Sequence, residues 1–168
     1  LVEAVAMRDE LENTIIVYTS DHGEMLGEHG RWAKLVPHEA SIRVPLIVAG
    51  PGVQHAARSD ALVELTDLSA TFVDQVGLDV PAEWDARSLV PLLADVAVEH
   101  RDAQISMLHD WQLIRTQEWK LIKTNGEPSH LFNLVTDPKE LENLVEAQDC
   151  RAIALEMADL LATRIDSQ

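Results

Sequence analysis

One polar stretch, Ser20-Asp-His-Gly-Glu-Met-Leu-Gly-Glu-His-Gly-Arg-Trp-Ala-Lys34, combines the residue types that a metal and an anion would need. Asp21 and His22 are neighbours, and both can reach one cation if the backbone turns sharply at Gly23, which glycine permits. Oxygen ligands suit calcium, magnesium or manganese, whereas a nitrogen ligand favours manganese or zinc. Lys34, in the same stretch, could place its ammonium on an oxyanion held by that metal.

The same stretch also has a purely structural interpretation. A Ser-Asp pair after a strand commonly forms a turn or a helix cap, and a lysine in a loop is usually solvated. Against this, loops of such length without regular structure are uncommon unless they are functional. The residue types alone therefore leave both a metal and anion site and an ordinary surface loop open.

The apolar segments around this loop predict an α/β arrangement. Residues 1–12 have the pattern of the end of an amphipathic helix. Residues 14–19 are continuously β-branched or aromatic, which is typical of a strand buried on both faces in a parallel sheet, and residues 44–49 predict a second buried strand. Because ligands of open α/β sheets bind outside the carboxyl ends of the strands, Asp21 and His22 would stand at the functional edge.

The remainder of the chain predicts a smaller α+β region. Asp67 is expected to cap a helix that ends at Gly77, and residues 88–93 predict a short helical turn. A small antiparallel sheet is then predicted from four short segments: 104–108, 111–116, 119–123 and 130–134. Asp137-Pro138 predicts a helix start. We therefore divide the chain into regions 1–100 and 101–168.

The last segment predicts an amphipathic helix that packs on the small sheet. Its apolar face consists of Ile153, Met157, Leu160, Leu161 and Ile165.

Composition and charge exclude several classes of function. The formal net charge is −16, from 13 basic and 29 acidic residues, so nucleic acid and anionic membranes are excluded as partners. No apolar run approaches the roughly 20 residues that cross a bilayer. Cys150 is the one cysteine, so no intrachain disulfide can form, and a single thiol does not indicate a compartment. The opening Leu1-Val2-Glu3 has neither Met nor a basic leader, and we expect the true N-terminus to lie upstream.

The loop and the strand after it resemble the C-terminal half of the sulfatase family, which belongs to the alkaline-phosphatase-like superfamily. The resemblance rests on residues 19–34, on Pro37-His-Glu-Ala-Ser-Ile-Arg-Val-Pro-Leu-Ile-Val48 and on Gly50-Pro-Gly52. It continues more loosely through residues 66–71, 77–81, 87–89, 114–122 and 131–144. The implied fold is the C-terminal part of an alkaline-phosphatase-like α/β sheet sandwiched by helices, followed by a small antiparallel sheet packed on a C-terminal helix.

The resemblance implies a chemistry for the loop. Sulfatases hydrolyse sulfate esters with a formylglycine hydrate as nucleophile and a divalent metal, usually calcium. Asp21 and His22 match metal ligands of the family, and Lys34 matches the lysine that contacts the sulfate and steadies charge on the bridging oxygen. Many arylsulfatases have Asn at the position of His22. The histidine form is similar to choline-type sulfatases and to phosphonate monoester hydrolases, some of which use manganese, so manganese and magnesium stay alternatives to calcium.

The nucleophile motif of the family, Cys/Ser-x-Pro-x-Arg, has no match in this chain. Cys150 is followed by Arg151 and Ala152, so we expect it to be an inert packing residue. The resemblance then implies that formylglycine lies in a missing N-terminal half, which would be the partner of this chain. Without a nucleophile we expect no turnover of the small anionic sulfate ester by this chain alone. Exposed sheet edges would favour self-association.

Five further residues are candidates for supporting roles. His109 and Trp111, at a turn of the small sheet, and His38 are candidates for contact with the substrate. Packing beneath the last helix is the structural alternative for Trp111. His29 and Glu39 are both expected to fix the conformation of the loop rather than to take part in the chemistry.

A few charged residues are expected to be structural or solvated. Arg43 is the expected partner of Glu39. Arg115, Lys120 and Lys123 are expected on a solvated face of the small sheet, and a bridge to the large domain is the alternative for Arg115.

Three functions remain open at this point. The first is the C-terminal portion of a metal-dependent sulfuric ester hydrolase. The second is a phosphonate or phosphate monoester hydrolase of the same superfamily, and the third is a non-catalytic binding module. The residue at the nucleophile position upstream would discriminate them.

Overall fold

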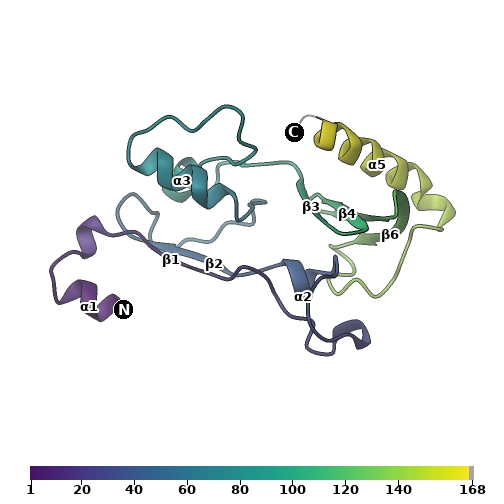
Figure 1. Ribbon diagram of the computed structural model, residues 1–168, viewed down its shortest axis with the longest axis horizontal. Coiled ribbons are helices and arrows are strands. Elements are labelled where there is room, and N and C mark those ends of the chain that lie inside the picture. Colours follow the sequence, from purple (N-terminus) through teal and green to yellow (C-terminus); the bar gives the residue numbers. More distant parts are fainter. Residues whose placement is uncertain (167–168) are drawn as a thin grey trace. The chain divides into compact units, whose positions relative to one another are not determined.

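The computed structural model describes residues 1–166, which form two compact units (Figure 1). The first unit contains Leu1–Asp21 and Val44–Arg101; the second contains His22–Arg43 and the residues from Asp102 onward. The chain passes between the units at residues 101 and 102, one residue after the predicted boundary, while residues 22–43 belong to the second unit. Compact units are not in themselves domains, so the division into 1–100 and 101–168 stays a prediction.

The first unit consists of short helices and one pair of strands. Its elements are α1 (Val2–Ala6), η1 (Leu11–Asn13), β1 (Ile16–Thr19), β2 (Leu46–Ala49), α3 (Asp67–Gln75) and α4 (Val90–Ala94). Gly50, directly after β2, lies close to the chain that leads into β1: a Cβ there would be 2.6 Å from the carbonyl oxygen of Thr14. The predicted strands and helices of this region are present with different bounds: most are shorter, and α4 ends one residue after the predicted 88–93.

The expectation of a parallel sheet is wrong for β1 and β2. Their register is antiparallel and runs from Ile16 opposite Ala49 to Thr19 opposite Leu46. A continuous apolar run indicates a strand that is buried on two faces. It does not show whether the neighbouring strand is parallel or antiparallel. The cross-strand neighbours Tyr18 and Ile47 are 64% and 61% exposed, so this sheet presents apolar side chains to solvent.

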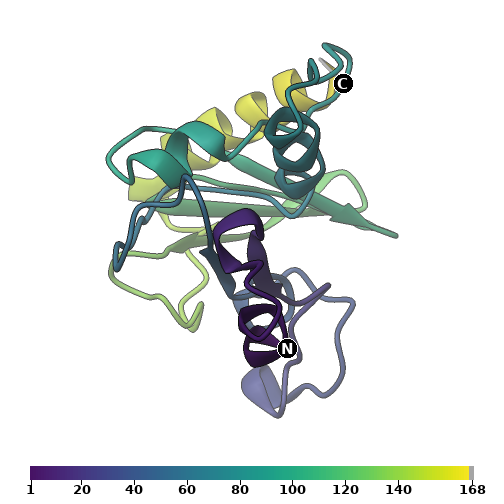
Figure 2. The same cartoon turned by 90° about the vertical axis from the view of Figure 1, so that its left-hand side faces the viewer.

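The second unit is built on a four-stranded antiparallel sheet, as predicted. Its strands, in the order β3-β4-β5-β6, are β3 (Gln104–Leu108), β4 (Trp111–Arg115), β5 (Trp119–Thr124) and β6 (Glu127–Asn133). The other elements are η2 (Glu28–Gly30), α2 (Glu39–Ile42), η3 (Gln148–Cys150) and α5 (Arg151–Asp166). In both views α5 runs along one face of the sheet (Figure 1, Figure 2).

The two faces of this sheet carry separate hydrophobic clusters. The prediction that the last helix packs on the sheet is confirmed: Met157 and Leu161 of α5 join Ile114, Leu121 and Leu131 in one cluster. The half-buried Cys150 packs against the same cluster. Alternation along β4 and β5 sends the neighbouring residues to the other face, where the second cluster forms. Its members are Trp111, Leu113, Ile122 and Phe132, with Ile42 of α2 packed against them.

Two predicted helix signals are wrong. No helix starts at Asp137-Pro138, because Glu140 has a φ of 57°, which a right-handed helix does not accommodate. Asp67 begins α3 without capping it: its carboxylate accepts hydrogen bonds from the backbone N–H groups of Glu64 and Arg87, which lie outside the helix. None of the helices in residues 1–166 has both the length and the apolar character of a membrane span.

Candidate functional site

The sequence predicts the site loop over residues 20–37. Its residues 22–37 are folded tightly by backbone contacts within the second unit. The N–H of Gly23 donates to the carbonyl of Ser41 at 2.7 Å, and a Cβ at Gly23 would lie 2.0 Å from the carbonyl oxygen of Ala40. Close approach to α2, rather than an unusual turn conformation, therefore requires glycine here. Met25 is buried, and its N–H donates to Ala33 at 3.0 Å. This contact turns the chain back, so that Lys34 returns to the start of the loop.

His22 and Lys34 meet across this loop. The Nδ1 atom of His22 lies 2.8 Å from the carbonyl oxygen of Gly23. A carbonyl oxygen only accepts, so Nδ1 carries the proton and Nε2 keeps its lone pair. The Nζ atom of Lys34 lies 2.5 Å from that Nε2. A cationic group thus faces the imidazole lone pair that a metal ion would use.

Asp21 ends the first unit, directly before His22. It is exposed, and its Oδ1 accepts a hydrogen bond from the hydroxyl of Ser20 at 3.4 Å. A carboxylate and an imidazole with a fixed tautomer are a donor set that a divalent cation accepts. The expectation that Asp21 and His22 share one cation stays a prediction. Two donors are fewer than such an ion takes, so a site here would need ligands from other residues.

A buried ion-pair cluster lies beside α2. The Nζ atom of Lys120, which is fully buried in β5, is 3.1 Å from Oε1 of Glu39 and 2.6 Å from Oε1 of Glu140. The Nε atom of Arg115 is 3.5 Å from the same Glu39 oxygen. The expectation that Lys120 is solvated is therefore wrong, and the Glu39 carboxylate pairs with Lys120 and Arg115 rather than with Arg43. These partners are distant in sequence, so local pattern does not reveal them.

Glu140, which the sequence analysis did not single out, is held ionised in this cluster. Burial on its own raises the pKa of Glu140, but the hydrogen bond from His38 and the ammonium of Lys120 outweigh it and lower the pKa to about 2. The second carboxylate oxygen lies 3.1 Å from Nδ1 of His38 and accepts the Glu39 N–H at 2.9 Å. The start of α2 is thereby attached to the turn after β6.

Two predicted histidines meet at Glu140. The rings of His29 and His38 stack with centroids 4.1 Å apart and an interplanar angle of 14°. Ligand atoms of His29, His38 and Glu140 all lie within 4.8 Å of one another. His130 is near, with its ring centroid 6.3 Å from that of His38, and burial together with the charge of His38 lowers its pKa. The described residues thus include one His/Glu group that could hold a metal ion.

The other two predicted residues, His109 and Trp111, differ sharply in exposure. Trp111 is 7% exposed, belongs to the cluster on the sheet face opposite α5, and donates its indole N–H to the carbonyl of Leu35 at 3.0 Å. The expectation that it packs beneath the last helix is wrong. It instead anchors the residue next to Lys34. His109 lies exposed in the turn before β4, with a φ of 53°.

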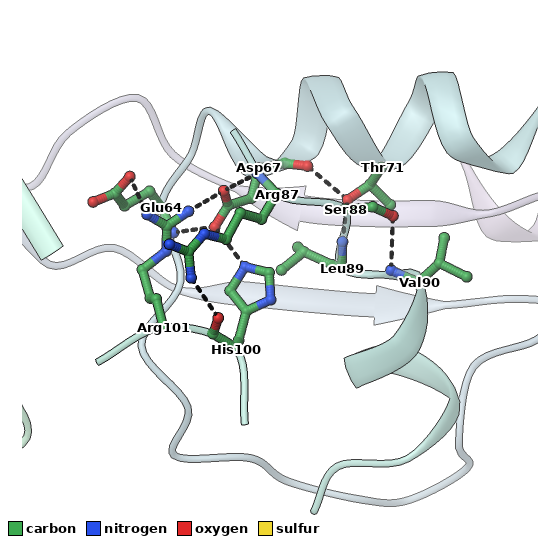
Figure 3. A network of polar contacts seen from close by, with 9 residues as sticks. All are labelled: Glu64, Asp67, Thr71, Arg87, Ser88, Leu89, Val90, His100 and Arg101. Carbon is green, nitrogen blue, oxygen red and sulfur yellow. Dashed lines mark hydrogen bonds and ion pairs between the residues drawn. The ribbon is translucent and has the colours of Figure 1, made fainter. Parts of the chain in front are cut away.

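A second polar network, drawn in Figure 3, organises the first unit around the fully buried Asp67. One carboxylate oxygen accepts from the N–H of Glu64 at 2.8 Å and lies 3.0 Å from Nε2 of His100. The other accepts from the N–H of Arg87 at 2.9 Å and from the guanidinium of Arg101. Burial opposes ionisation, but these contacts lower the pKa of Asp67. The network joins the start of α3 to two loops and has a structural role.

The comparisons with known proteins identify the family of this chain. Residues 27–167 match the family described as N-sulphoglucosamine sulphohydrolase, C-terminal. Arylsulfatase K of Canis lupus familiaris is 34% identical over 163 residues, which cover 86% of this chain and 30% of that protein. Choline-sulfatase of Rhizobium meliloti (strain 1021) is 35% identical over 156 residues, which cover 87% of this chain and 30% of that protein.

Solved structures give the same result. A structure of BT4656 in complex with its substrate D-glucosamine-2-N,6-O-disulfate has a TM-score of 0.92 and 30% identity, covering 99% of this chain and 37% of that one. A phosphonate monoester hydrolase of Agrobacterium radiobacter has a TM-score of 0.85 and 28% identity. The match covers 99% of this chain and 38% of that one. The chain thus spans about a third of the length of the proteins it matches. The predicted fold class is confirmed.

Proposed function

Because this chain belongs to the sulfatase family and corresponds to its C-terminal portion, we propose that it is part of a metal-dependent sulfuric ester hydrolase. Its contribution to the active site is Asp21, His22 and Lys34. The single observation that supports this best is the pairing of Lys34 Nζ with the lone pair of His22 Nε2 at 2.5 Å. That pairing gathers a metal-type ligand and an anion-binding cation in one loop.

Asp21 and His22 are the metal ligands in this proposal. The fixed tautomer of His22 supports the role, because Gly23 occupies Nδ1 and makes Nε2 the atom that would bind the ion. The Lys34 ammonium faces that atom in this structure and would have to turn from it to the anion when an ion binds. Calcium is the expected ion, with manganese or magnesium as alternatives. When bound, such an ion supplies a positive charge that stabilises the sulfate oxygens.

Lys34 binds the sulfate group and stabilises negative charge on the ester oxygen as the bond breaks. The net charge of −16 repels anions from the chain as a whole, so a local cation is needed to attract a small sulfate ester. Trp111 holds this lysine in place through its hydrogen bond to the neighbouring residue Leu35.

His109 is the proposed contact for the alcohol portion of the substrate. It is exposed, and it precedes Trp111 by only two positions, close to the anchor of the site loop. Trp111 and His38 are largely buried and already hydrogen-bonded, which suits positioning better than contact with substrate.

The nucleophile, a formylglycine, belongs to the part of the enzyme outside this chain. The 168 residues contain no Cys/Ser-x-Pro-x-Arg motif, so this chain alone has no route through a covalent intermediate and no turnover of its own.

A phosphonate monoester hydrolase is the second candidate. It is supported by the TM-score of 0.85 to such an enzyme. The identities of 34% and 35% to two sulfatases favour the sulfate ester.

A metal titration of the full-length enzyme tests the proposal. Asp21→Ala should weaken binding of the activating ion and abolish hydrolysis of a sulfate ester together, because a hard cation loses a carboxylate ligand. Asp85→Ala, which changes an exposed carboxylate in the same unit, should leave both unchanged. Full activity and unchanged metal affinity in Asp21→Ala would remove Asp21 from the ligand set.

A further inference from the structure

We propose that His29, His38 and Glu140 form a second metal site, suited to zinc, that fastens the site loop to the turn after β6. Ligand atoms of these three residues already lie within 4.8 Å of one another. They come from distant parts of the chain, since Glu140 follows His38 by 102 positions. The site shares no residue with the pair Asp21 and His22.

The ligand set favours zinc over the ion expected at Asp21. Two imidazoles and one carboxylate, with a fourth position left for water, are a common set in zinc sites. Calcium prefers six to eight oxygen ligands, and this cluster offers one carboxylate only. The two sites therefore differ in the kind of ion that each prefers.

The geometry around His38 and Glu140 is close to what such an ion needs. Zinc with bonds of about 2.0 Å in a tetrahedron holds its ligand atoms about 3.3 Å apart. Nδ1 of His38 and Oε2 of Glu140 are 3.1 Å apart and share one proton in a hydrogen bond. Zinc would replace that proton. His29 is exposed and its ring stacks on that of His38, so the ring would have to turn out of this stack to complete the site.

The surroundings of the cluster hold the carboxylate in place without an excess of positive charge. The Glu39 N–H and the Lys120 ammonium fix the two oxygens of Glu140, an outer shell of the kind that orients metal ligands. The charges of the buried Lys120 and the partly buried Arg115 are balanced by those of Glu39 and Glu140. Arg31 and His130 are the further basic groups near the site.

The site would control the loop that carries Lys34. His29 and His38 lie on either side of Lys34 in sequence, and His38 is the residue before α2. An ion bound to both histidines and to Glu140 would hold this segment against the sheet at both ends. Stacking of the two rings and the hydrogen bond to Glu140 could hold the loop without an ion, and the experiment separates these two cases.

Zinc binding is measured by equilibrium dialysis of the chelator-treated protein carrying Asp21→Ala, so that the proposed catalytic site is removed first. We expect one zinc per chain. His29→Asn should lower the affinity at least tenfold. Asparagine tolerates the left-handed backbone of His29, which has a φ of 51°. His109→Asn is the matched control, because His109 is exposed too and has a φ of 53°.

Unchanged zinc affinity in His29→Asn would overturn the proposal, as would an absence of bound zinc in the parent. Should His29→Asn fail to fold, the visible absorption spectrum of cobalt(II) bound to the parent is measured instead. A tetrahedral visible spectrum that is lost in His38→Asn, which keeps an N–H donor for Glu140, supports the site. A spectrum unaffected by that change, or no tetrahedral band, contradicts it. Because Asp21 is already removed, either result is independent of the proposed hydrolase function.

Discussion

The ammonium of Lys120 lies 2.6 Å from the carboxylate of Glu140, and water reaches almost none of either side chain. Glu39 completes the cluster at 3.1 Å from the same ammonium. A buried ion pair gains little net stability over a well-packed apolar pair, but the loss of one member leaves an uncompensated charge. These three residues join β5, α2 and the turn after β6, and therefore hold the base of the site loop.

Replacement of Lys120 by Met should lower the free energy of unfolding by about 3–5 kcal/mol, because the buried Glu140 and the partly buried Glu39 lose their common cation. Urea denaturation followed by circular dichroism measures the loss. Lys123→Met, on the same strand but half-exposed, should change it by less than about 1 kcal/mol. Equal losses in the two variants would mean that the cluster does not stabilise the second unit.

Glu140 should make stability depend on acid pH. Its pKa falls from 4.5 to about 2 on folding, so its contribution is fully present above pH 4.5 and is lost as pH falls towards 2. In metal-free buffer, the difference in unfolding free energy between the parent and Glu140→Gln should be constant near neutral pH and shrink on acidification. A difference that stays constant down to pH 2 would show that Glu140 is not held ionised.

Asp67→Asn should destabilise the first unit by about 3 kcal/mol. The amide keeps one oxygen but turns its NH2 group towards two of the four donors that now meet the carboxylate, and it removes the negative charge opposite Arg101. Thermal and urea unfolding measure this effect. Asp85→Asn, at an exposed position of the same unit, should stay within about 0.5 kcal/mol. Equal unfolding free energies of the two variants would contradict a stabilising role of the network in Figure 3.

Trp111→Phe tests whether Trp111 positions Lys34. Phe keeps an aromatic ring in the cluster but removes the N–H that binds the Leu35 carbonyl, at a cost of about 1 kcal/mol in stability. In the full-length enzyme kcat should fall while KM changes little. A rise in KM at constant kcat would instead indicate direct contact between the indole and the substrate.

Sequence pattern predicted best those elements whose signals are local. The bounds 104–108 agree with β3, and the apolar face containing Met157 and Leu161 packs on the sheet as expected. The resemblance to sulfatases through residues 19–34 is likewise confirmed at the level of the family. Within that stretch, the structure brings His22 and Lys34 together.

Features that depend on distant partners were not predictable. Nothing near Lys120 in sequence shows that Glu39 and Glu140 are its partners, so a solvated lysine was the reasonable expectation. Asp137-Pro138 has the pattern of a helix start, but the requirement to bury Glu140 at a positive φ prevents the helix. The antiparallel pairing of β1 with β2 is a matter of topology, which an apolar run does not encode.

The most direct test of the proposed function is the hydrolysis of 4-nitrophenyl sulfate and of a 4-nitrophenyl phosphonate ester by the full-length enzyme and its Lys34→Ala variant. The account predicts that the sulfate ester is the better substrate and that Lys34→Ala lowers kcat on it by about 100-fold to 1,000-fold. Lys139→Ala, which removes an exposed lysine, should have no effect. Parent-like turnover of the sulfate ester by Lys34→Ala, or a preference for the phosphonate, would contradict the account.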